Sequence, residues 1–215
     1  ADDAVLSHVP NSCPKMHAAM DTRTYQRVAA AWGHHTGSFL LADQQGLGKS
    51  IETLATIMES AGASTSTQYH LIFAPLVAVE SVWSREVQRW LDSNHAGVLP
   101  LTGSLAERQE ALVAALDTPT DLAHVFVVAN IESARIKPHY PEGKPRTAKN
   151  ARYDTADAVL PALFGRIWDT IVVDECQRAL IRTTGSPTQV RAGFSILSKS
   201  SERRIALSGT PIRGK

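Results

Sequence analysis

One stretch near the start of the chain restricts the possible folds more than any other. Residues 38–54 read Ser-Phe-Leu-Leu-Ala-Asp-Gln-Gln-Gly-Leu-Gly-Lys-Ser-Ile-Glu-Thr-Leu, which predicts a short apolar strand, a glycine-bearing loop and then a helix. Gly46 and Gly48 allow the loop to take positive φ at low cost. Several backbone N–H groups and the positive end of the helix dipole would then point to one place. The stretch therefore predicts a cradle for phosphate groups.

Two side chains at the start of the predicted helix strengthen the interpretation. Lys49 adds a full positive charge, and Ser50 adds a hydroxyl that can bind a magnesium ion, as in the pattern G-x-x-x-x-G-K-[ST]. The pattern has a glycine where this chain has Asp43, so an ordinary glycine turn before a helix is the alternative. Two segments further along the chain favour the phosphate site. We expect its nucleotide-binding residues to be Gln45, Gly46, Leu47, Gly48, Lys49 and Ser50.

Composition places the chain among globular proteins. With 215 residues, of which 43% are hydrophobic and 20% charged, it is long enough for one large domain. The net charge of +1 does not indicate a partner, so a nucleic-acid surface would have to come from local clustering. No apolar run approaches the roughly 20 residues that cross a bilayer, and the N-terminus does not resemble a signal peptide. Two cysteines, Cys13 and Cys176, make no disulfide framework, which favours a reducing compartment inside the cell.

Apolar runs and helical periodicities alternate along the chain. We expect residues 1–21 to form an N-terminal arm and a single α/β unit to cover residues 22–215. Val79, Trp83, Val87 and Trp90 share one helical face and are expected in the core; Tyr25, Val28, Ala29 and Trp32 share another. The strands are expected at residues 38–41, 70–74, 98–101, 125–128, 169–173 and 204–207, and the helices at 22–32, 50–61, 79–90, 104–116, 155–164 and 186–200.

Two segments interrupt this alternation. Residues 135–153 contain three prolines and six basic residues, which predicts a mobile basic loop. Contact with a DNA backbone and solvated disorder are both compatible with it. The pair His34–His35 follows the first expected helix, and we expect it to lie on a solvated loop rather than to bind a metal.

Strands that alternate with helices predict a parallel sheet with helices on both faces, in which ligands bind at the carboxyl ends of the strands. Asp174 and Glu175 follow a fully apolar strand. Lys49 can neutralise the terminal phosphates, Ser50 and Asp174 can hold magnesium, and Glu175 can orient or deprotonate an attacking water. An ordinary strand end is the alternative for the two acids. Cys176, with no histidine near it in sequence, is expected to be a small buried residue.

Taken in order, these segments resemble the first motor lobe of superfamily 2 helicases. More narrowly, they are similar to the Swi/Snf family of ATP-dependent translocases on double-stranded DNA, which includes chromatin remodellers. In that family Asp is the usual residue at position 43. The resemblance implies a RecA-like P-loop NTPase fold of three layers. It rests on Gln26, residues 43–50, residues 71–76 with Trp83 and Glu86, residues 174–177, and residues 207–212.

The resemblance also implies functional roles, with ATP and Mg2+ as cofactors and double-stranded DNA as partner. Gln26 would read the adenine, and Pro75-Leu76 would contact the DNA backbone, with a weaker contact at residues 129–132. Gln177 and the segment Ser208-Gly209-Thr210 would couple the state of the nucleotide to movement of the lobe. Nucleosomes or other proteins would bind through further domains. The protein would act in the nucleus of a eukaryote, or otherwise in the cytoplasm.

The sequence departs from the family pattern in three places. Gln44-Gln45 replaces Glu-Met, and Cys176-Gln177 replaces Ala-His, so the link from the two acids to the coupling segment can differ. The chain also stops soon after that segment, and we expect the family's second lobe to be absent from these 215 residues. A fragment of this kind should bind Mg-ATP weakly and hydrolyse it slowly. The alternatives are an inactive helicase-like scaffold, or the motor lobe of an RNA helicase or a restriction system.

Overall fold

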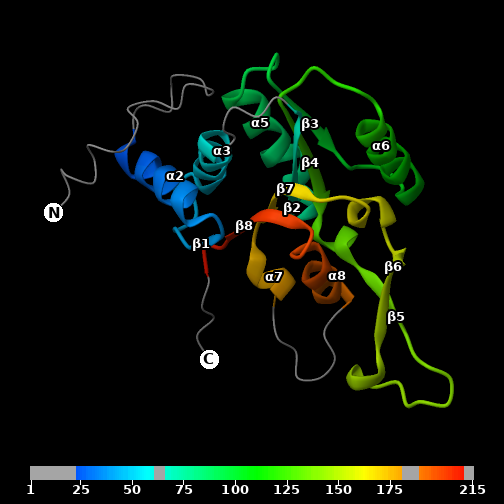
Figure 1. The fold of residues 1–215 in the computed structure, drawn as a ribbon. Helices are drawn as coiled ribbons and strands as arrows, with labels where there is room; N and C mark the ends of the chain where they lie inside the picture. Colours follow the sequence, from blue (N-terminus) through cyan, green and yellow to red (C-terminus); the bar gives the residue numbers. More distant parts are fainter. Residues whose placement is uncertain (1–22, 61–65, 181–188, 211–215) are drawn as a thin grey trace.

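Six strands form one sheet in the order β1-β8-β7-β2-β4-β3, and every neighbouring pair is parallel (Figure 1). The computed structural model describes residues 23–60, 66–180 and 189–210. The predictions for residues 1–21, for Cys13, and for residues 62–65, 186–188 and 211–215 fall outside these ranges. The strands are β1 (Phe39–Leu41), β2 (Gln68–Ala74), β3 (Ala96–Pro100), β4 (His124–Asn130), β7 (Trp168–Val173) and β8 (Ser201–Leu207).

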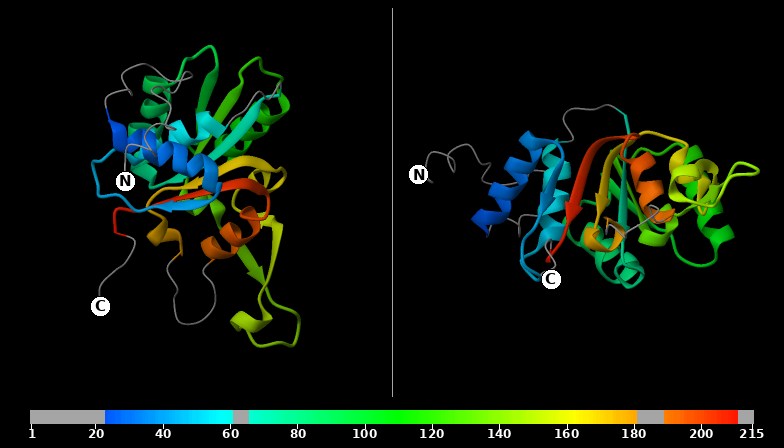
Figure 2. Two further views of the ribbon diagram at one scale, coloured as in Figure 1. Left: turned by 60° about the vertical axis from the view of Figure 1, so that its left-hand side comes forward. Right: turned by 90° about the horizontal axis from the view of Figure 1, so that it is seen from below.

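Helices cover both faces of this sheet, so the predicted three-layer α/β fold is confirmed (Figure 2). Alternate residues of each central strand enter different cores: Ile72 of β2 packs in one, and Leu71 and Phe73 in the other. The first core lies under α2 (Thr24–Thr36), α3 (Lys49–Ser60) and α5 (Arg85–Trp90), and the second under α6 (Leu105–Asp117), α7 (Cys176–Leu180) and α8 (Gln189–Leu197). Burial on both faces explains the continuous apolar runs of these strands.

Several local predictions are confirmed. Ser104 caps α6, accepting a hydrogen bond from the backbone N–H of Glu107, while the Glu107 carboxylate accepts one from the backbone N–H of Ser104. Trp83 and Cys176 are buried, as expected for core residues.

The buried face of α2 differs from the predicted one. Tyr25 and Trp32 are 42% and 52% exposed, whereas Gln26, Ala30 and Gly33 are buried. Small residues line this face because its neighbours approach closely: a Cβ added to Gly33 would lie 2.6 Å from the ring of Phe39. The helix also continues to Thr36, so the exposed pair His34–His35 lies in its last turn and not on a loop.

The basic segment forms a hairpin rather than a loop. Strand β5 (Ile136–His139) pairs with β6 (Arg152–Ala158) in an antiparallel sheet of two strands, and the connection contains the 3-10 turn η4 (Ala148–Asn150). The helix predicted at residues 155–164 is therefore wrong: its first part is strand, and its second part is the 3-10 turn η5 (Pro161–Phe164). Exposed and half-buried residues alternate along β6, which is the period of a strand. The alanines of the segment favour a helix when the sequence is considered alone.

The described part of the chain contains no helix that is both long and apolar enough to cross a membrane.

Candidate functional site

The phosphate loop (residues 42–48) joins the end of β1 to the start of α3. Gly46 and Gly48 have φ values of 84° and 95°, as the sequence predicts for a loop that curls before a helix. The Lys49 ammonium lies over the loop and donates hydrogen bonds to the carbonyls of Asp43, at 2.8 Å, and Gln44, at 3.0 Å. Ser50 lies half-buried in the first turn of α3. Lys49 and Ser50 are therefore both at the end of the loop where α3 begins.

Helix α2 fixes the other side of the phosphate loop. The hydroxyl of Tyr25 and the amide nitrogen of Gln26 both donate to the carbonyl of Leu47, at 2.8 and 3.0 Å. A Cβ on Gly48 would lie 2.4 Å from that amide nitrogen, so a larger residue would displace the Gln26 side chain in addition to the strain of a φ of 95°. Gln26 thus lies beside the loop, with its amide nitrogen engaged by the loop backbone.

Asp174 lies directly after β7, and three groups hold it. Its own N–H donates to the carbonyl of Phe73, at 2.7 Å, which extends the sheet by one hydrogen bond. Its carboxylate accepts hydrogen bonds from the backbone N–H of Glu175, at 2.8 Å, and from the indole N–H of Trp83, at 3.0 Å. Burial raises the pKa of Asp174 above its usual value, while the two hydrogen bonds and the Lys49 ammonium oppose this rise.

Trp83, which donates a hydrogen bond to Asp174, lies on an unusual helical segment. Residues Val79–Ser84 form a π-helix between the short helix α4 (Leu76–Ala78) and α5. Such segments are rare and are often found at functional sites. Trp83 is fully buried within it and directs its one polar group at Asp174. The helical spacing predicts the burial of Trp83, but no sequence signal indicates this hydrogen bond.

A chain of hydrogen bonds connects Glu175 to the segment after β8. Glu175 has a φ of 49°, in the left-handed region, which is unusual for a residue other than glycine. The amide nitrogen of Gln177 donates to the Glu175 carboxylate, and its amide oxygen accepts from the hydroxyl of Ser208, at 2.8 Å. The Ser208 hydroxyl in turn accepts from the N–H of Thr210, at 3.1 Å. Gln177 therefore links Glu175 to Ser208, although it replaces the histidine of the family pattern.

The phosphate loop also contacts this last segment. A Cβ on Gly209 would lie 2.8 Å from the Gln45 side chain, so Gly209 passes directly against the loop. Together with the effect of Lys49 on Asp174, this contact shows that the three predicted segments meet at the carboxyl edge of the sheet. Leu47 and Gly46 are exposed there, whereas Ser208 is fully buried.

Glu52 is a residue of this region that the sequence analysis did not single out. It lies in the first turn of α3, is 1% exposed, and neither carboxylate oxygen has a hydrogen-bond partner among the described residues. Burial, and secondly the nearby Asp43, raise its pKa to about 8. The signal available in the sequence was one acid within a predicted helix that has no other charged residue from position 51 to position 58.

Two curated proteins are similar to this chain over most of its length. Chromodomain-helicase-DNA-binding protein 8 of Danio rerio is 26% identical over 195 residues, which are 89% of this chain and 7% of that protein. Helicase ssl-1 of Caenorhabditis elegans is 24% identical over the same shares. The chain therefore spans only 7% of the length of these relatives.

Solved structures with the same fold include two DNA-bound proteins. The Sulfolobus solfataricus SWI2/SNF2 ATPase core in complex with dsDNA superposes with a TM-score of 0.60 at 20% identity, over 95% of this chain and 35% of that one. A nuclease-deletion mutant of the Type ISP restriction-modification enzyme LlaGI, in complex with a DNA substrate mimic, gives a TM-score of 0.52 at 15% identity, over 89% and 18%. At these identities the likeness establishes the fold alone.

A match to a protein family covers almost the whole of the described chain. Residues 25–215 match the SNF2-related domain, from the helix that carries Gln26 to the end of the chain. The chain belongs to the SNF2-related domain family and is a helicase-like ATPase lobe of the Swi/Snf type.

Proposed function

We propose that this chain is the ATP-binding lobe of a motor that couples hydrolysis of Mg-ATP to movement along double-stranded DNA. The observation that carries the proposal is the convergence of three distant segments at one edge of the sheet. The phosphate loop, Asp174 with Glu175, and the segment after β8 are connected through Gln177 and through the contact of Gly209 with the loop.

The residues present fit a magnesium-bound nucleoside triphosphate. A Cβ on Gly46 would meet nothing within 4 Å, so the loop backbone is open where phosphate oxygens would approach. Lys49 already lies over the loop, bound only to carbonyls that anionic oxygens can replace as partners. No three His, Cys, Asp or Glu side chains of the described residues could form a metal site by themselves. One hydroxyl and one carboxylate suit Mg2+, which keeps several waters and shares phosphate oxygens.

Each residue then has a role. Lys49 neutralises the terminal phosphates, and Ser50 and Asp174 hold the metal, which supplies further charge neutralisation. Glu175 orients a water and accepts its proton. Gln177 connects Glu175 to Ser208 and Thr210, so a change at Glu175 is transmitted to the segment that follows β8. Gln26 reads the adenine from its place beside the loop. The low reactivity expected of the isolated chain follows from the family's use of a second lobe.

Titration calorimetry with Mg-ATP tests the nucleotide site. Lys49→Ala should weaken binding about tenfold or more, since hydrogen bonds to charged groups contribute roughly 1.5–3 kcal/mol. Ser50→Ala should lower the affinity for Mg-ATP and leave that for metal-free ATP unchanged. Lys199→Ala, an exposed lysine in the connection before β8, is the control.

Two results would contradict the proposal. Equal affinity of the wild type and Lys49→Ala would remove the phosphate role. A wild-type chain that binds no nucleotide at millimolar concentration would favour the scaffold. Fast, DNA-stimulated hydrolysis by these 215 residues alone would overturn the expectation of low activity.

A further inference from the structure

The hairpin β5–β6 projects from the body of the molecule. It begins after β4 and the 3-10 turn η3 (Ile131–Ala134), at the carboxyl edge of the sheet, which is also the edge of the candidate nucleotide site. Figure 1 shows it extending past α8, on the side of the sheet where α7 lies. Its base is tied to the body, because Ile136 is fully buried and pairs with Ala158. Its outer part is solvent-exposed.

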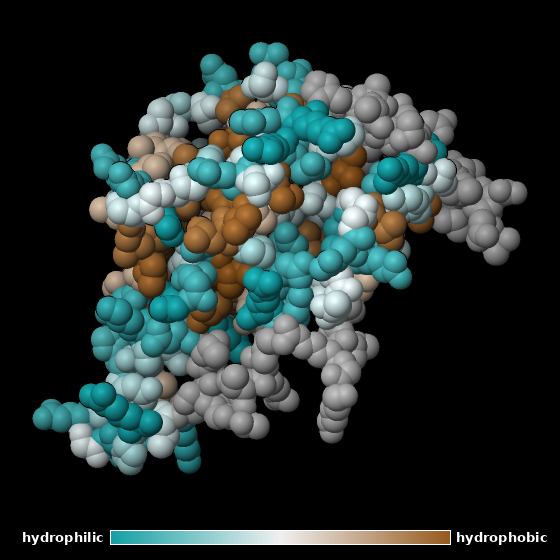
Figure 3. Space-filling view, turned by 180° about the vertical axis from the view of Figure 1, so that it is seen from behind, coloured by the Kyte–Doolittle hydropathy of each residue, from teal (hydrophilic) through white to brown (hydrophobic). Residues whose placement is uncertain are grey.

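Positive charge is concentrated on the outer part of the hairpin. Residues 137–152 contain five basic residues and one acid, Glu142, although the whole chain has a net charge of only +1. The remainder of the chain is therefore net negative. All five basic side chains are exposed: Lys137, Lys144, Arg146, Lys149 and Arg152. In Figure 3 the same projection appears at the lower left as a mainly hydrophilic surface.

These charges are not neutralised by neighbours within the described residues. The ion pairs in this region join Arg135 to Glu132 and His139 to Asp157, both near the base of the hairpin. None involves Lys144, Arg146 or Lys149. These three cations lie on one narrow projection and repel one another, so the arrangement favours an anionic partner.

The hairpin is also adjacent to the segments that would face DNA. Ala74 at the end of β2 lies opposite Asn130 at the end of β4, so the residues that follow the two strands are neighbours. By family resemblance Pro75-Leu76 contacts the DNA backbone. The hairpin continues from the second of these strand ends, and an exposed row of Lys and Arg is the usual means of holding phosphates.

We propose that the hairpin β5–β6 is a further DNA-binding element, whose outer lysines and arginines hold the phosphate backbone of a duplex independently of its sequence. This inference rests on the proposed function, since it places the duplex along the carboxyl edge of the sheet. Arg146 lies over the ring of Tyr140, 6.0 Å from its centroid, which orients one of the cations. The other cations are on flexible side chains and act as point charges.

The salt dependence of duplex binding tests the proposal. Each phosphate contact contributes about 0.9 to the slope of log K against log salt. A tenfold change in salt concentration then changes the affinity roughly eightfold for each contact. Lys144→Gln combined with Arg146→Gln should therefore lower the slope by about 1–2 and weaken binding about tenfold or more, equally for duplexes of different sequence. Fluorescence anisotropy with labelled duplexes at 50–200 mM salt measures both quantities.

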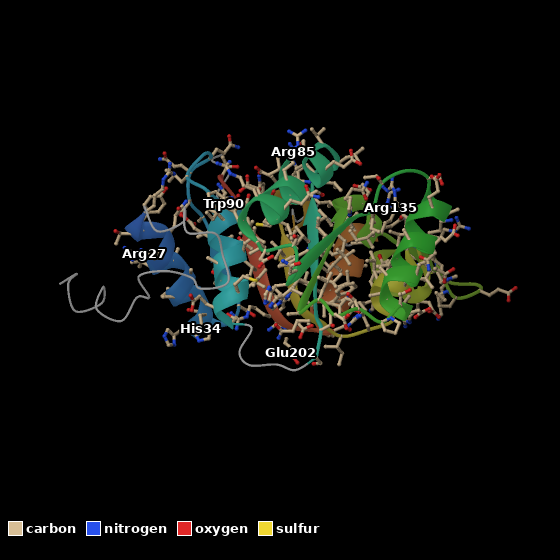
Figure 4. The ribbon with its side chains drawn as sticks, turned by 90° about the horizontal axis from the view of Figure 1, so that it is seen from above. Arg27, His34, Arg85, Trp90, Arg135 and Glu202 are labelled. Atoms are coloured by element: carbon tan, nitrogen blue, oxygen red, sulfur yellow. The ribbon has the colours of Figure 1, made fainter. Side chains whose placement is uncertain are left out.

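The control removes the same charges elsewhere. Arg85 begins α5, which packs on the first core and so covers the other face of the sheet, and Lys199 lies in the connection from α8 to β8, at the amino edge of the sheet. Figure 4 shows Arg85 well separated from Arg135 at the hairpin base. Arg85→Gln with Lys199→Gln should keep the wild-type slope. A thermal melt of both double variants checks that they fold.

Any of three results in the duplex-binding assay overturns the inference. The tip variant can keep the wild-type slope and affinity, both double variants can weaken binding equally, or no duplex binding can be measured at 50 mM salt. An acidic protein is the competing partner: if poly-glutamate binding needs the tip charges and duplex binding does not, the inference is also wrong. Mg-ATP affinity is the separate readout of the nucleotide site. If Lys49→Ala leaves this affinity unchanged while the tip variant still weakens duplex binding, only the proposed function is contradicted.

Discussion

Glu52 is a buried acid whose removal should stabilise the protein near neutral pH. Its pKa is raised from 4.5 to about 8. In the unfolded chain the carboxyl ionises from about pH 4.5 upward, whereas in the folded chain it holds its proton until about pH 8. The contribution of Glu52 to the free energy of unfolding is thus at its full value below pH 4.5, and it is lost as the pH rises from 4.5 to about 8. This direction is opposite to that of the usual paired acid, whose pKa is lowered by folding.

The size of the effect follows from the two pKa values. At pH 7 the shift corresponds to about 3 kcal/mol of lost stability, as an upper value because relaxation around a charged group reduces it. For Glu52→Gln we expect a gain of about 2 kcal/mol, or about 4–8 °C in Tm for a chain of this length. The buried amide adds its own desolvation cost, which does not change with pH.

Thermal unfolding of the wild type and Glu52→Gln from pH 4.5 to 8 is the assay. The difference in stability between the two should grow with pH, by at most about 1.4 kcal/mol per unit. Glu59, half-buried in the last turn of the same helix, supplies the matched control Glu59→Gln. A difference between wild type and Glu52→Gln that stays constant over this range would refute the reasoning, because packing alone would then explain it.

Three further tests probe the geometry of the site. Trp83→Phe keeps an aromatic ring but removes the N–H that holds Asp174; unfolding free energy should fall by about 1–3 kcal/mol, and calorimetry should show weaker binding of Mg-ATP but not of metal-free ATP. Gly48→Ala should destabilise the chain more than Gly46→Ala in chemical denaturation, since both have positive φ but only Gly48 lies under the buried glutamine of α2. Glu175→Gly should be about 1 kcal/mol more stable than Glu175→Ala, because only glycine is free of strain at a φ of 49°.

Much of the fold could be predicted because its signals are local and repeated. The central strands are apolar along their whole length since both faces of the sheet are covered, and the phosphate loop combines glycines, a lysine and a hydroxyl within a few residues. The hairpin could not be predicted in the same way. Its strands contain no continuous apolar run, and its prolines and charges also suit an unpaired loop.

The prediction of the buried face of α2 was wrong for a different reason. Periodicity favours large apolar side chains as the buried ones, but here the neighbouring strand and helix lie so close that Ala30 and Gly33 fill the contact. Gln26 is buried because its amide is engaged by the phosphate loop. In the site itself, the sequence predicted which residues meet but not the groups that position them, since the hydrogen bond from Trp83 to Asp174 depends on the π-helix.

The glutamine at position 177 explains how the link between Glu175 and Ser208 persists without a histidine. A carboxamide carries a donor and an acceptor, and here the donor serves the Glu175 carboxylate while the acceptor serves the Ser208 hydroxyl. Neutral imidazole offers the same pair, but protonated imidazole has two donors and would lose the hydrogen bond from Ser208. Because the amide does not titrate, Gln177 presents the same donor and the same acceptor to its two neighbours whatever the pH. We therefore expect the communication between the acid pair and the last segment to be insensitive to protonation of its central residue.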